Sequence, residues 1–120
     1  MKLRLSPEQI QFRLSAKDYD RLKNSEVISE RIHLASGLSI EYQVRSHPDS
    51  VGADGNALDF TNTSTSGHVV LILTVYRNAM DMLALPSHAK EGVKEFLTFG
   101  NSDMLTIAID VDLTRRPAGA

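Results

Sequence analysis

Five basic side chains are the residues of this sequence best suited to binding chemistry. Lys2, Arg4 and Arg13 alternate with apolar residues, so they project from one face of two short strands near the N-terminus. Arg31 and Arg45 could extend this face. Because arginine prefers planar anions such as carboxylate and phosphate, the face predicts contact with an acidic protein or a small anionic ligand. The structural alternative is a solvated face that nearby acidic residues neutralise.

Three titratable residues offer a second possibility. His47 and Asp49 lie in a polar segment, residues 46–56, and Glu30 is a carboxylate at an otherwise apolar position of a strand. If the three converge between the sheet and this loop, they would line the pocket of a small enzyme or ligand-binding protein. The alternative for Glu30 is the edge or end of a strand, where its carboxylate reaches water.

Two further patterns resemble catalytic motifs but have simpler explanations. Ser87 and Lys90 match the Ser-x-x-Lys motif of penicillin-recognising enzymes, yet the other motifs of those enzymes are missing, and Ser87 suits a helix cap. Asp110 and Asp112 project to one face of the last strand, where salt bridges to Lys2, Arg4 or Arg13 explain them best. The histidines are scattered without metal-ligand spacing. No catalytic residue, metal or cofactor is predicted.

Composition limits the function classes further. The chain has 120 residues, of which 42 % are hydrophobic and 23 % charged, as expected for one globular domain. A net charge of −2 makes nucleic-acid binding unlikely. The apolar run Val69–Val75 is too short to cross a membrane. The chain has no cysteine and no apolar core of a signal peptide, which predicts a cytoplasmic protein.

The elements that would position the basic face begin with an N-terminal hairpin. Ser15 and Asp18 then form a capping box, which predicts a helix over Ala16–Lys23. A second hairpin follows, with a three-residue loop over residues 35–37. The loop length sets a register in which Arg31 faces Glu41, and it places Glu30 on the apolar side of the hairpin.

The second half of the chain is predicted to be mostly strands. Val69–Tyr76 is apolar at nearly every position, so we expect a central strand covered on both faces. A bend over residues 77–81 and a strand over 82–85 follow. A second helix is predicted from Ser87, with an apolar stripe of Ala89, Val93, Phe96 and Leu97 and a stop at Gly100. A last strand ends near residue 113.

These elements predict an α+β fold. It would consist of a largely antiparallel, curled sheet of about seven to eight strands with two short helices. Residues 1–113 form the single domain, and residues 114–120 form a flexible C-terminal tail. Two short helices cannot cover both faces of the central strand, so a second sheet layer, barrel-like curvature or a homodimer must cover the rest.

The opening segment resembles a known protein family. Met1-Lys2-Leu3-Arg4-Leu5, followed by Ile10-Gln11-Phe12-Arg13-Leu14-Ser15 and a short helix, is similar to the start of an uncharacterised family of small bacterial proteins. The step from Leu85-Pro86 into a helix is similar to that family as well. The resemblance covers about half of the chain. It implies the fold and a bacterial source, and it carries no known activity.

Two functions of different classes follow from these residues. The first is a non-catalytic binding or assembly module that uses the basic face or an open sheet edge and forms a homodimer. The second is a small enzyme or anion-binding protein with the pocket of Glu30, His47 and Asp49. They differ in what they require, because a module needs an exposed complementary surface and an enzyme needs converging titratable groups.

Overall fold

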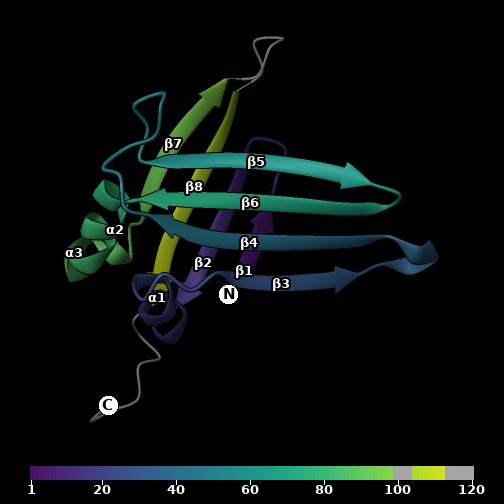
Figure 1. The fold of residues 1–120 in the computed structure, drawn as a ribbon, viewed down its shortest axis with the longest axis horizontal. Coiled ribbons are helices and arrows are strands. Elements are labelled where there is room, and N and C mark those ends of the chain that lie inside the picture. The colour runs from purple at the N-terminus through teal and green to yellow at the C-terminus, as the bar shows by residue number, and fades with distance from the viewer. Residues whose placement is uncertain (99–103, 113–120) are drawn as a thin grey trace.

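The computed structural model describes residues 1–98 and 104–112, which fold into two four-stranded sheets and three short helices (Figure 1). The helices are α1 (Ala16–Lys23), α2 (Arg77–Ala84) and α3 (Pro86–Ala89), with a 3₁₀ turn at Ala35–Gly37. The strands are β1 (Lys2–Leu5), β2 (Gln9–Ser15), β3 (Ile28–His33), β4 (Ser39–His47), β5 (Leu58–Thr65), β6 (His68–Tyr76), β7 (Val93–Thr98) and β8 (Met104–Asp112).

Each sheet consists of two antiparallel hairpins joined by a parallel pair of strands. Sheet I has the order β1-β2-β8-β7, and its central strands β2 and β8 are parallel. Sheet II has the order β3-β4-β6-β5, and its central strands β4 and β6 are parallel. The fold is therefore α+β and mostly antiparallel. The expected single curled sheet is wrong, because the hairpins divide between two layers.

The chain consists of two halves with the same topology. In the first half, hairpin β1–β2 is followed by α1 and hairpin β3–β4; in the second, hairpin β5–β6 is followed by α2 and hairpin β7–β8. Helices α1 and α2 both have 8 residues, β3 and β7 both have 6, and β4 and β8 both have 9. The parallel register pairs Phe12 with Ile109 in sheet I and Leu73 with Val44 in sheet II. Phe12 of the first half is equivalent to Leu73 of the second, and Val44 is equivalent to Ile109. Each sheet therefore contains one hairpin from each half: sheet I consists of the first and last hairpins of the chain, and sheet II of the two middle ones.

The core lies where the two sheets cross, next to the helices. Phe12 of sheet I and Phe60 of sheet II meet there, with ring centroids 6.5 Å apart. The fully buried apolar side chains come from both sheets and from the two longer helices: Phe12, Leu14, Leu22, Val44, Leu58, Leu73, Val75, Leu83, Ile107, Ile109 and Val111. Each such side chain contributes about 2 kcal/mol of transfer free energy to folding. The alternating apolar residues of β2 and β8 thus point into the core, as the sequence pattern predicts.

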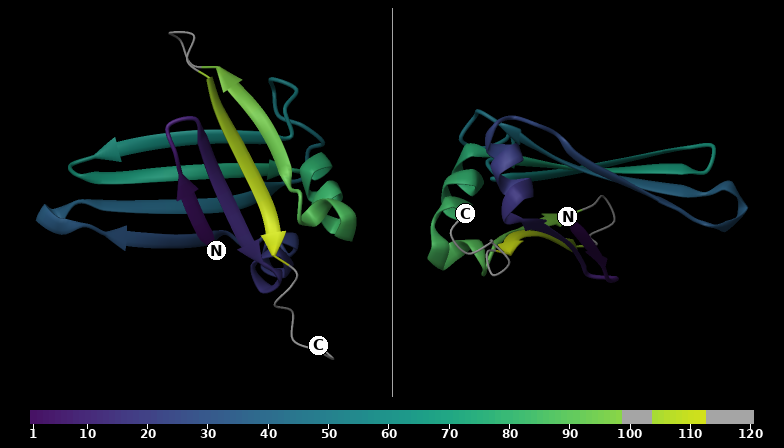
Figure 2. Two further views of the ribbon diagram at one scale, coloured as in Figure 1. Left: turned by 180° about the vertical axis from the view of Figure 1, so that it is seen from behind. Right: turned by 90° about the horizontal axis from the view of Figure 1, so that it is seen from below.

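Sheet II is longer than the region that sheet I covers. The helices lie at one end of sheet II, and its other end projects beyond strand β1 (Figure 1). Figure 2 shows in its right-hand view that the two sheets form two layers only near the helices. We call the projecting end the overhang. Its inner face carries six apolar side chains: Ile32, Leu34, Leu38, Ile40, Val69 and Leu71.

Local patterns predicted the first half of the chain well. Helix α1 has the predicted bounds, and the capping box is present, because Ser15 Oγ accepts from the Asp18 backbone N–H while the Asp18 carboxylate accepts from that of Ser15. Tyr19 and Leu22 are buried, as their spacing requires. The β3–β4 register pairs Arg31 with Glu41, as predicted from the three-residue loop.

The predicted second helix is confirmed only for its first turn, which is α3, and the strand before it is wrong. Ser87 lies inside α3, whose N-cap is Leu85, so its predicted role as a helix cap is wrong too. Residues 77–84 form helix α2, which buries Ala79 and Leu83 one turn apart, and Pro86 begins α3. Residues 93–98 form strand β7 instead, in which Phe96 is 65 % exposed. A spacing of four residues, as between Val93 and Leu97, fits a helix turn and also the alternation of a strand, so it could not separate the two. The predicted stop at Gly100 and the tail lie outside the described residues.

Candidate binding sites

The basic face predicted from the N-terminal hairpin forms in part on sheet I. Strands β1 and β2 pair Lys2 with Arg13 and Arg4 with Gln11, and these four side chains surround a small hollow of about 60 Å³. The hollow opens on the face of sheet I that points away from sheet II. We keep the name basic face for Lys2, Arg4 and Arg13.

A buried carboxylate neutralises part of the basic face. Asp110 is 6 % exposed, and its carboxylate accepts hydrogen bonds from Arg13 Nε at 3.0 Å and from Gln11 Nε2 at 2.6 Å. The hydrogen bond and the charge of Asp110 raise the pKa of Arg13. The predicted salt bridge from β8 to the N-terminal hairpin is thus confirmed for this pair. Lys2 and Arg4 make no ion pair within the described part of the chain, so they are the cations available to a ligand.

The structure does not bring Arg31 and Arg45 to this face. Both lie on the outer face of sheet II, where Arg31 Nη2 donates to Glu41 Oε1 at 2.8 Å and Arg45 Nε donates to Thr74 Oγ1 at 3.1 Å. The hydrogen bonds from Arg31 and Gln43 lower the pKa of Glu41 to about 2. Both arginines therefore serve interactions within sheet II.

The three residues of the alternative pocket do not converge. Glu30 lies on β3, 3.7 Å from the Met1 amine, and is half exposed. His47 Nδ1 accepts from the Asp49 backbone N–H at 3.1 Å, while the Asp49 side chain is exposed. His47 does line a pocket of about 440 Å³, but its other walls are helices α1 and α2.

Sequence reasoning missed a polar network on the outer face of the overhang. Parallel pairing of β4 with β6 places Ser39 beside His68, and Ser39 Oγ lies 2.5 Å from His68 Nδ1. His68 Nε2 lies 3.5 Å from Glu41 Oε1. Nothing in the sequence gives this register, because the strands are joined through a long loop and another strand.

This network has the residue types of a serine hydrolase but not the arrangement of one. Ser39 is almost fully buried, and its backbone N–H donates to the Gly67 carbonyl, so this amide cannot stabilise an oxyanion. Glu41 is already engaged by Arg31, Gln43 and Ser29. We therefore interpret the network as structural, holding the two central strands of the overhang in register.

The inner face of the overhang lacks a covering layer. On β6, Leu73 and Val75 are fully buried in the core, whereas Val69 and Leu71, which point to the same side, are half-buried. Ile32 of β3 is 41 % exposed. The expectation that β6 is central is confirmed, since it lies between β4 and β5. The expectation that both of its faces are covered is wrong, because sheet I covers only the inner face of its second half, and Val70 and Ile72 on the outer face are half-buried.

Within residues 1–98 and 104–112, no group of three or more His, Asp or Glu side chains is arranged to hold a metal ion. None of the helices in this part of the chain combines the length and the apolar composition that a membrane span needs.

Comparison with known proteins gives one match. A family model described as a family of unknown function, DUF7009, matches residues 1–115. The chain belongs to the DUF7009 family. The match covers both halves of the fold, and thus includes the basic face, the overhang and the pocket between the helices. No curated protein and no solved structure matches the chain. The DUF7009 assignment carries no activity, so a function has to be argued from the surfaces above.

Proposed function

We propose that this protein is a non-catalytic assembly module that pairs with a second copy of itself through the inner face of the overhang. The observation that carries the proposal is the incomplete burial of β6. This strand is apolar on both sides, and sheet I covers the inner face of its second half, yet the inner face of its first half, with Val69 and Leu71, has no covering layer.

A second copy fits the shape of the missing layer. The uncovered surface is a gently twisted sheet face, and sheets pack face to face at about 10 Å with their apolar side chains interdigitated. Sheet I ends at β1, a strand of four residues whose outer edge is free of strand partners, so the second layer stops abruptly beside the overhang. In a two-fold arrangement, each copy would supply the layer that the other lacks, and the assembly would close as a dimer.

The chemistry of the face also favours a copy over a charged ligand. The six apolar side chains of the overhang face are aliphatic, and β5 adds the neutral Asn62 and Ser64 beside Leu71 and Val69. Glu30, the acid on this face, lies beside the Met1 amine. Leu34 and Leu38, both nearly half exposed, extend the face to the turn that ends the overhang. A contiguous apolar patch of this kind on a protein surface usually marks a protein interface.

Pairing through the overhang would leave the basic face free. Lys2 and Arg4 lie on the opposite side of sheet I from sheet II, and they would remain available to acidic groups of another partner. The proposed dimer thus has one apolar surface for itself and one basic surface for further contacts.

Light scattering coupled to size exclusion, at low and high salt, tests the proposal. We expect a dimer that resists salt, because apolar burial is not screened by ions. The double variant Ile32→Lys, Leu38→Lys should be monomeric. Phe96→Lys is the matched control, since Phe96 is an exposed apolar residue on the outer face of sheet I, and it should remain dimeric. A wild-type monomer, or a double variant that still dimerises, would overturn the proposal.

A further inference from the structure

A pocket of about 440 Å³ separates the two equivalent helices. Its floor consists of the more buried lining side chains of both helices, Tyr19, Leu22 and Met80, and the exposed Ala84 lines it as well. Its rim carries Lys23, His47, Arg77 and Asp81. The volume lies within the range of about 300–1,000 Å³ that is typical of small-molecule sites.

The pocket lies at the carboxyl ends of the parallel strands of sheet II. His47 ends β4, Tyr76 ends β6, and the two residues face each other in the register, with ring centroids 5.1 Å apart. Helix α2 begins directly after β6, and α1 closes the other side. Ligands of open sheets with parallel strands bind outside the carboxyl ends of those strands, where the chain diverges in different directions.

Hydrogen bonds fix every wall of the pocket. Tyr19 Oη donates to the Met80 carbonyl at 2.9 Å and so ties α1 to α2. Ser46 Oγ donates to the Leu22 carbonyl at 3.2 Å and ties β4 to α1. Arg77 Nη1 donates to the Pro48 carbonyl at 3.4 Å and ties α2 to the loop. A pocket held in this way loses little conformational entropy when a ligand binds.

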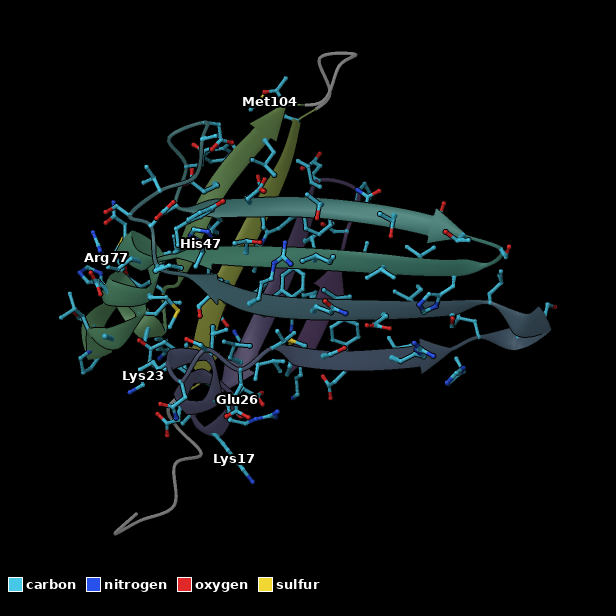
Figure 3. All side chains as sticks on the ribbon, in the orientation of Figure 1. Lys17, Lys23, Glu26, His47, Arg77 and Met104 are labelled. Carbon is cyan, nitrogen blue, oxygen red and sulfur yellow. The ribbon has the colours of Figure 1, made fainter. Side chains whose placement is uncertain are left out.

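The charges of the rim favour an anion. Among the lining residues, Lys23 and Arg77 are cations and Asp81 is the one acid. Lys23 also pairs with Asp20 at 3.5 Å, but both side chains are about half exposed, and such a surface pair is weak enough to leave the ammonium available to a ligand. Figure 3 shows Lys23 beside α1, and His47 and Arg77 at the α2 end of β4 and β6, so the cations come from different walls.

The end of α1 does not oppose an anion here. A helix C-terminus carries exposed carbonyl oxygens that repel negative charge. The Leu22 carbonyl at this end already accepts from Ser46 Oγ and from the backbone N–H of Ser25. Lys23 lies in the same last turn, with its ammonium 5.2 Å from the centroid of the Tyr19 ring. Its charge is thus held over the floor of the pocket.

We infer that this pocket binds a small organic anion with a flat apolar body and one carboxylate or sulfonate group. The body would lie on Tyr19 and Met80 between the helices, and the anionic group would lie at the rim between Lys23, His47 and Arg77. This site is separate from the overhang, and it does not depend on the proposed dimer.

Anilinonaphthalene sulfonate is a suitable probe, since it combines an aromatic body with one sulfonate and fluoresces when it leaves water. We expect one site per chain in fluorescence and calorimetric titrations. Phenylnaphthylamine, which has the same body without the charge, should bind about tenfold more weakly. Equal or tighter binding of the neutral probe would overturn the assignment of an anion.

Variants locate the bound probe. Ala84→Phe fills the pocket and should abolish binding, whereas the overhang variant Ile32→Lys, Leu38→Lys should keep it. The reverse result would place the probe on the overhang and overturn the inference.

A charge reversal at the rim gives a test that does not depend on how the core tolerates a larger side chain. Lys23→Glu should weaken binding about tenfold. Lys17→Glu makes the same charge change on an exposed position of the same helix, outside the pocket, and should bind like the wild type. Equal affinities of these two variants would also overturn the inference.

Discussion

Tyr19 donates a hydrogen bond of 2.9 Å to the carbonyl of Met80, the residue at the equivalent position of the other half of the chain. Both residues are the fourth of an eight-residue helix that directly follows a central strand. The approximate two-fold axis that relates the two halves therefore passes close to this hydrogen bond. It is also one of the contacts that close the pocket between α1 and α2.

Removing this hydrogen bond should loosen the junction of the halves. We expect Tyr19→Phe to lower the free energy of unfolding by about 1 kcal/mol, the usual net value of one such bond. Urea denaturation measures the change. Tyr76→Phe is the control, because the Tyr76 hydroxyl has no hydrogen bond to a described residue, and it should have a smaller effect. Equal losses in both variants would argue against a special role of the Tyr19 bond.

The pair of Arg13 and Asp110 should contribute more to the free energy of unfolding than the equivalent pair in sheet II. Arg13→Ala leaves the buried Asp110 carboxylate with Gln11 alone, and we expect a loss of about 2 kcal/mol. The equivalent pair of sheet II is Thr74, in the place of Arg13, and Arg45, in the place of Asp110, so here the arginine bonds to a neutral hydroxyl. Arg45→Ala should therefore cost less than about 1 kcal/mol. Chemical denaturation of both variants gives the comparison, and a larger loss for Arg45→Ala would contradict this explanation.

The low pKa of Glu41 predicts a specific response to acid. Because the folded chain holds this pKa at about 2, the carboxylate contributes stability that is fully present above the ordinary glutamate pKa. This contribution should disappear as the pH falls from about 4.5 to about 2. In Arg31→Gln, the pKa of Glu41 should rise toward its ordinary value. NMR titration of the side-chain carboxyl carbon measures both values, and an unchanged midpoint in the variant would show that Arg31 is not the main cause.

Gly92 should tolerate no side chain. Its φ is +80°, and a Cβ there would lie 2.4 Å from the Ile109 carbonyl oxygen. We expect Gly92→Ala to cost about 3 kcal/mol or more, since both backbone strain and a clash at the β7–β8 pair oppose it. Gly55 has a similar φ of +84° but open space around it, so Gly55→Ala should cost only about 1 kcal/mol. Thermal denaturation distinguishes them, and similar melting temperatures would mean that β7 shifts to make room.

The basic face should give salt-dependent retention on a sulfonate column. Lys2→Glu combined with Arg4→Glu removes the two cations of the basic face that make no ion pair with a described residue, and we expect earlier elution than for the wild type. Lys17→Glu combined with Lys90→Glu changes the net charge equally at exposed positions elsewhere. If both double variants elute together, total charge rather than the basic face controls retention.

Sequence patterns predicted what depends on neighbours along the chain. The capping box at Ser15 and the register that pairs Arg31 with Glu41 both involve residues a few positions apart, and both are present. The spacing of Val93 and Leu97 fits both a helix and a strand. The structure decides for a strand, in which Phe96 points away from the core and is exposed.

The candidate sites were less predictable, because long-range pairing creates them. Ser39 meets His68 only through the parallel pairing of β4 with β6. The pocket needs helix α2, which the sequence pattern did not indicate, so His47 was assigned to a different set of partners. The overhang arises because the strands of sheet II are longer than the width of sheet I, which crosses them. No local sequence pattern encodes that difference in size.

The pairing of β2 with β8 has a consequence for synthesis of the protein. Arg13 and Asp110 are separated by 97 positions, so hairpin β1–β2 meets its partner strand only after β8 has been made. Sheet II can form earlier, because its four strands lie between residues 28 and 76. We therefore expect folding to begin in the middle of the chain and to finish by joining its two ends, and contacts so distant in sequence make that last step slow. Until then, the free edge of β2 is the part of the nascent chain most exposed to wrong strand pairing.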